Sequence, residues 1–168
     1  MANYPQLDNA SGVWNLREVY DAVMGGYWPN ANSRGLLAGG NTPNGGTNYI
    51  SIIDFINMSS SGNASNFGDL STDRFSAGGM SSFTRAVFGG GYQSPGAATN
   101  VIDYVTFSTE GNAADFGDMT ASLDLTAPVS NSIRGVQAGG QGSPSNIIQY
   151  ITLASTGNAT DFGDLTQA

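Results

Sequence analysis

The sequence contains no cysteine, no histidine and no lysine. Without cysteine it can form no disulfide bond, and without histidine it lacks the commonest general base and the commonest zinc ligand. All of its positive charge comes from five arginines, against thirteen acidic residues and a net charge of -8. Because a negatively charged protein repels phosphate backbones, we expect no nucleic-acid partner.

Long apolar segments are also missing. A membrane-spanning helix needs roughly 18 or more consecutive apolar residues, so we expect no membrane insertion. The first ten residues, MANYPQLDNA, do not have the basic and apolar pattern of a signal peptide. No Gly-Lys-Ser/Thr motif follows the glycine pairs, which excludes a phosphate-binding P-loop. We expect no cofactor.

The sequence does contain one pattern that is repeated three times. Each copy begins with an arginine and a glycine pair, continues with a short apolar segment, and ends in the motif GNAxxFGD. The copies begin with RGLLAGG (34–40), RAVFGGG (85–91) and RGVQAGG (134–140). They end with GNASNFGD (62–69), GNAADFGD (111–118) and GNATDFGD (157–164). Self-similarity at a fixed period indicates a repeat architecture.

Constant spacing within the copies marks the packed elements. The apolar segment and the GNA motif are separated by nine residues in every copy, whereas the segment after the glycine pair varies in length. The variable segments have the Pro/Gly/Asn/Ser composition of surface loops. They are residues 41–49, 92–100 and 141–146.

The apolar segments predict short β-strands. Residues 101–107 and 147–153 are β-branched and aromatic, with turn residues on both sides. Residues 74–81 and 123–130 are each expected to hold one further strand. The sequence therefore predicts an all-β body over residues 34–168, with units at about 34–70, 71–119 and 120–168. Four short strands in a period of about 47–49 residues are typical of a propeller blade.

A separate segment, residues 1–33, precedes this body. Apolar residues between Val13 and Val23 recur at helical spacing, and Gly25–Gly26 would end the helix. This segment predicts one short helix that docks against the repeats or against another subunit, and that attaches the chain or joins its copies. An aromatic platform for sugars is the alternative. The docking residues expected here are Trp14, Leu16, Tyr20 and Trp28.

Arginine, aspartate and phenylalanine recur at equivalent repeat positions. Because repeated positions serve packing in every unit, we interpret them as structural, with the arginines making ion pairs or carbonyl contacts to the neighbouring unit. A ligand site is the alternative for the arginines. The paired acids, such as Asp115 and Asp118, are of the right type for Ca²⁺, but we favour turns and expect no metal. The set is Arg34, Arg85, Arg134, Asp69, Asp118, Asp164, Phe67, Phe116 and Phe162.

The middle unit resembles a kelch repeat. Arg74, the pair Gly90–Gly91, Tyr104 and Phe116 match the arginine, the glycine pair, the tyrosine and the fourth-strand aromatic residue of a kelch blade. The usual tryptophan is Phe116 here, and the third unit has no arginine equivalent to Arg74. The resemblance implies kelch-like repeats, as propeller blades or prism-like sheets, and a protein–protein interaction module is one function that it implies.

Two further stretches resemble structural proteins of marine bacteriophages, especially phages of cyanobacteria. SGVWNLREVYDAVMGGYWP (11–29) is similar to a segment common in those proteins, and the repeat is similar to blades of their tail-fibre and appendage proteins. The resemblance implies a non-enzymatic component of the virion, such as a tail fibre, appendage or capsid-associated protein. It also implies other virion proteins as partners, and contact between the variable loops and host surface glycans. A polysaccharide hydrolase ranks last, because no single carboxylate pair stands out.

Three units are too few to close a propeller, which needs about four blades or more. Open sheet edges favour association with another chain. Two chains could complete a six-bladed ring, three chains could wrap around one axis, or one chain could form a prism-like body. We expect a homo-oligomer, with the trimer favoured.

Overall fold

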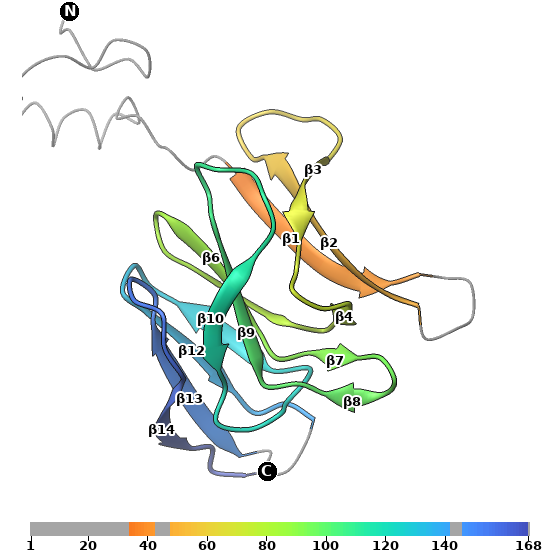
Figure 1. The fold of residues 1–168 in the computed structure, drawn as a ribbon. Coiled ribbons are helices and arrows are strands. Elements are labelled where there is room, and N and C mark those ends of the chain that lie inside the picture. The colour runs from red at the N-terminus through yellow and green to blue at the C-terminus, as the bar shows by residue number, and fades with distance from the viewer. Residues whose placement is uncertain (1–33, 43–47, 142–145, 168) are drawn as a thin grey trace, which may run out of the picture. The chain divides into compact units, whose positions relative to one another are not determined.

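The computed structural model describes residues 34–42, 48–141 and 146–167. These residues form an all-β unit of fourteen strands in four antiparallel sheets (Figure 1). These described residues contain no helix, and their sheets form no closed barrel or propeller. Among them there is accordingly no helix long and apolar enough to cross a membrane. The helix expected near residues 13–23 and its four docking residues lie outside the described residues.

Three of the sheets correspond to the three sequence repeats. The first sheet is β1 (Arg34–Asn41), β2 (Tyr49–Asn57) and β3 (Ser65–Asp69). The second is β5 (Gly78–Ser81), β6 (Arg85–Gly89), β9 (Val101–Thr106) and β10 (Ala114–Asp118). The third is β11 (Ala127–Ser130), β12 (Arg134–Ala138), β13 (Ile147–Thr152) and β14 (Thr160–Asp164). Neighbouring strands in each sheet follow the order of the chain.

The segments expected to hold one opening strand are divided in two. In the second repeat, β4 (Arg74–Phe75) leaves β5 and pairs with β7 (Tyr92–Gln93), which pairs with β8 (Ala97–Ala98) in a small separate sheet. The division falls at Ser76, whose φ of 57° turns the chain, and Leu125 has a φ of 53° at the same place in the third repeat. A left-handed residue interrupts a strand because its backbone is not extended.

The phenylalanine of every FGD motif is the extra residue of a β-bulge. The register between the last two strands of each sheet shifts at Phe67, at Phe116 and at Phe162. A bulge bends the strand and redirects a side chain. The repeated sequence is therefore the signature of one repeated backbone irregularity.

The hydrophobic core consists of two clusters, one between each pair of successive sheets. One cluster joins Ile53 and Phe67 of the first sheet to Phe88, Val105 and Phe107 of the second repeat. The other lies between the second and third repeats, and its members are Met80, Val87, Ile102, Phe116, Met119, Leu123, Ile151 and Leu153. Because the middle sheet contributes residues to both clusters, both of its faces are buried.

A buried ion pair lies within the second repeat. Arg74 and Asp103 are fully buried, and the Arg74 Nη2 atom donates to Asp103 Oδ2 at 2.8 Å. Ser71 donates its backbone N–H and its hydroxyl to the same oxygen, at 3.0 and 2.8 Å. Burial lowers the pKa of the Arg74 guanidinium, and the Asp103 charge opposes this effect. Arg74 Nε and Asp103 Oδ1 have no hydrogen-bond partner among the described residues.

The third repeat replaces this ion pair by a neutral one. Leu123 stands where the second repeat has Arg74, and Gln149 stands where it has Asp103. Both residues are buried. Thr120 donates its N–H and its hydroxyl to Gln149 Oε1, at 2.8 and 3.0 Å, as Ser71 does to Asp103. The hydrogen bonds to the carboxylate or amide oxygen are thus constant, and the arginine is not.

We predict that Arg74→Leu alone lowers the free energy of unfolding by about 3–5 kcal/mol, because Asp103 is then a buried charge without a counter-ion. The double variant Arg74→Leu/Asp103→Gln copies the third repeat and should recover to within about 1 kcal/mol of the original chain. Urea denaturation of the single and double variants measures the coupling. Additive losses would contradict this account.

Candidate functional site

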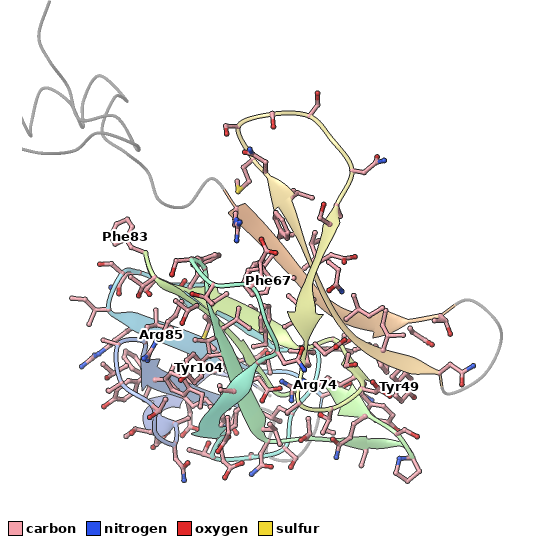
Figure 2. The ribbon with its side chains drawn as sticks, turned by 45° about the horizontal axis from the view of Figure 1, so that its top comes forward. Tyr49, Phe67, Arg74, Phe83, Arg85 and Tyr104 are labelled. Carbon is pink, nitrogen blue, oxygen red and sulfur yellow. The ribbon has the colours of Figure 1, made fainter. Side chains whose placement is uncertain are left out.

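The three repeated arginines lie over aromatic rings of their own sheets. The guanidinium carbon of Arg34 is 4.6 Å from the centre of the Phe55 ring, and Arg85 and Arg134 lie 4.7 Å from the ring centres of Tyr104 and Tyr150. Each aromatic ring also makes an edge contact with the phenylalanine of the same FGD motif, with ring centres 5.8–6.1 Å apart. Figure 2 shows Arg85 beside Tyr104.

Two of these arginines also reach the next repeat. Arg34 donates to the carbonyl oxygen of Phe107 at 3.1 Å and pairs with Glu110 at 3.0 Å. Arg85 donates to the carbonyl oxygens of Leu153 and Ala154, at 3.3 and 3.1 Å. Arg134 makes the same aromatic contact but, within residues 34–42, 48–141 and 146–167, donates no side-chain hydrogen bond. The arginines therefore join successive sheets wherever a following sheet exists.

The GNA and FGD motifs bind each other across successive repeats. Gly111 and Ala113 donate their N–H groups to the carbonyl oxygens of Phe67 and Asp69, at 2.8 and 2.7 Å, and Asn112 accepts from the Asp69 N–H at 3.1 Å. Three equivalent bonds join the next pair of repeats. Gly157 and Ala159 donate to Phe116 and Asp118, at 2.7 Å each, and Asn158 accepts from Asp118 at 3.0 Å.

Close approach explains the glycine in the FGD motif. A Cβ atom at Gly117 would lie 2.6 Å from the Gly157 carbonyl group, and one at Gly68 would overlap the carbonyl oxygen of Gly111. The φ angles of both glycines are also positive, at 142° and 156°. Backbone contact between repeats and the bulge both require glycine at this position.

The repeated aspartates take part mainly through their backbone. Asp69 and Asp118 contribute the N–H and carbonyl groups that bind the GNA motif, and Asp164 has no such partner in the described part of the chain. Asp115 and Asp161 each accept the N–H of the glycine two residues later, at 3.1 Å. In the same described residues, no three acidic side chains are close enough to hold a metal ion.

An aromatic cluster that the sequence did not single out lies beside the variable loops. Tyr49, Phe75 and Tyr92 come from three different strands, and their ring centres are 4.9–6.2 Å apart. An open hollow of about 550 Å³ is lined by residues that lie close to this cluster in the sequence, among them Asp73, Gln93 and Ser94. In Figure 2, Tyr49 lies at the opposite side of the view from the exposed Phe83.

We call this aromatic cluster and the adjoining hollow the loop end. Together they have the side chains of a surface that binds a polar ligand. Aromatic rings offer flat apolar faces, and a carboxylate, an amide and a hydroxyl offer hydrogen bonds in several directions. Tyr49 and Tyr92 border the variable segments, which is the only sequence signal that could have indicated them. No protein-family model matches the chain, and no curated protein matches it.

We predict that Asn112→Ala lowers the free energy of unfolding by about 1 kcal/mol, because the Asp69 N–H loses its acceptor. Asn158→Ala should have the same effect at the next junction. Asn63→Ala is the matched control, since Asn63 has the same place in the first repeat and its side chain makes no hydrogen bond in the described part of the chain. Thermal unfolding at low protein concentration, where contacts between copies do not contribute, compares the three. A loss for Asn63→Ala equal to that for Asn112→Ala would contradict the assignment.

Proposed function

We propose that the chain is a non-enzymatic structural component of a bacteriophage particle, whose kelch-like repeats form a rigid body and whose variable loops contact the host surface. The observation that carries the proposal is the combination of interlocked sheets with loops of variable length. Arginine contacts, GNA–FGD contacts and two buried clusters hold successive sheets in one register. The phage assignment itself rests on the sequence resemblance.

The repeats are proposed to be blades of a kelch-like propeller. In support, the second and third sheets are four-stranded antiparallel meanders in chain order. The connections that vary in length all follow the glycine pair, so they leave corresponding strands of each sheet. A scaffold of this kind can vary its loops without altering the packing between its sheets.

The paired acids do not favour a hydrolase. The Asp115 carboxylate accepts a backbone hydrogen bond from Gly117, and Asp161 repeats this contact with Gly163. A carboxylate that stabilises its own turn in each repeat has a structural role.

Homo-oligomerisation, other virion proteins as partners and location in the virion are part of the proposal.

Mass spectrometry of gradient-purified particles of the encoding phage tests the location. We expect the chain in a fixed ratio to the major capsid protein. Recovery only in the soluble fraction of infected cells, bound to a cellular protein, would contradict the virion assignment and favour the interaction module.

We predict that Tyr92→Ser/Gln93→Ala weakens binding of the purified protein to host cells by about tenfold, because an aromatic face and a hydrogen-bonding amide are removed from the loop end. Phe83→Ser is the control, since Phe83 is exposed in a turn between β5 and β6. Cell binding of fluorescently labelled protein gives both values. Equal binding by the original chain and the loop variant would exclude this surface as the receptor contact.

A further inference from the structure

Three sheets correspond to the three repeats, and the first and third of them each have an outer face. On these two outer faces, the repeat positions that are buried between successive sheets are exposed. On the third sheet, Phe162 is 56% exposed, whereas its repeat equivalents Phe67 and Phe116 are 2% exposed. Leu165 is likewise exposed where Leu70 and Met119 are buried. We call this the trailing face, and it includes Val136, Ile148 and Tyr150, which are partly buried.

The opposite face of the first sheet has the complementary set. Met58 is 72% exposed, whereas its equivalents Phe107 and Leu153 are 7% and 0% exposed. Leu37 is exposed where Phe88 is buried. We call this the leading face, and it also includes Ile52, Asp54 and Ile56. Strand alternation places these side chains opposite to Ile53 and Phe55, which pack against the second sheet.

Hydrogen-bonding groups are unpaired in the same complementary way. At the trailing face, among residues 34–42, 48–141 and 146–167, the backbone of Phe162–Asp164 binds no GNA motif and the Arg134 side chain binds no carbonyl oxygen. At the leading face, the motif Gly62–Ala64 has no FGD motif to bind, within the residues that the structure describes. The carbonyl oxygens of Met58 and Ser59 hold the positions that Leu153 and Ala154 hold for Arg85.

The two faces also have a matching side-chain acceptor and donor. In the second repeat the oxygen of Asp103 receives two hydrogen bonds from Ser71, and in the third repeat Gln149 receives two from Thr120. Asp54 is the equivalent acceptor on the leading face, and Thr166 is the equivalent donor at the trailing face. The apolar residues, backbone groups and polar side chains of each face are thus equivalent to the ones that bind the other face's equivalents inside the chain.

We infer that the trailing face of one copy binds the leading face of a second copy, with the contacts that join successive repeats inside the chain. This is a head-to-tail contact, so it either closes a ring or continues as a filament. Propellers have about four to eight blades, and two copies supply six repeats. The contact therefore predicts a closed ring of two chains, in place of the trimer expected from the sequence. The inference stands independently of the role in the phage particle.

Sedimentation velocity of the full chain over a wide concentration range gives the first test. We expect a species of twice the 17.3 kDa chain mass. Phe162→Asp and Met58→Asp each place a charge on one face, and each should weaken self-association by about a hundredfold or more. Both side chains are exposed in the single chain, so both variants should fold, which circular dichroism verifies. Phe83→Asp is the control and should leave association unchanged.

Mixing the two variants tests the head-to-tail geometry. The Met58→Asp chain keeps an intact trailing face, and the Phe162→Asp chain keeps an intact leading face. An equal mixture should therefore form a two-chain complex through one contact, although neither variant does so alone. A chain that is monomeric at all concentrations would overturn the inference. So would an oligomer that withstands both substitutions, because it would use another surface, or a mixture that stays monomeric.

Discussion

The structure depends on the contact in which the GNA motif of one repeat binds the FGD motif of the repeat before it. Three hydrogen bonds form at each of the two junctions, and the bulged phenylalanine enters the core beside them. Arg34 and Arg85, which begin the first two repeats, reach forward to the next repeat in the same way. Because each sheet buries a face only against its neighbour, its stability is largely a property of the interface, as in other repeat proteins.

This dependence explains which residues recur and which vary. The buried acceptor at Asp103 and Gln149 is served by the same hydroxyl and N–H group, while the arginine that neutralises the charge is present only where the charge is. The loops after the glycine pairs differ in length, and their described residues contribute none of the GNA–FGD or arginine contacts between repeats. The proposed host-contact surface on those loops could therefore change while these contacts between repeats stay the same.

Much of the fold was predictable from the sequence. The three units, their strands and the exact recurrence of arginine, glycine and phenylalanine follow from repeated spacing. Spacing did not predict that Ser76 and Leu125 take left-handed conformations and divide the opening segment, because either residue could continue a strand. Nor did it predict the cluster of Tyr49, Phe75 and Tyr92, since these three belong to strands far apart in the chain. The bonding role of Asn112 also required knowledge of which motif faces it.

The absence of cysteine allows a direct measurement of the contact between copies. Asp69→Cys/Asn112→Cys places two thiols at an internal junction, and Asp164→Cys/Asn63→Cys places them at the equivalent positions of the two outer faces. On mild oxidation the internal pair should cross-link within one chain. If the outer faces bind each other, the second pair should give a covalent two-chain species on a denaturing gel. An internal pair that cross-links beside an outer pair that stays monomeric would contradict the account.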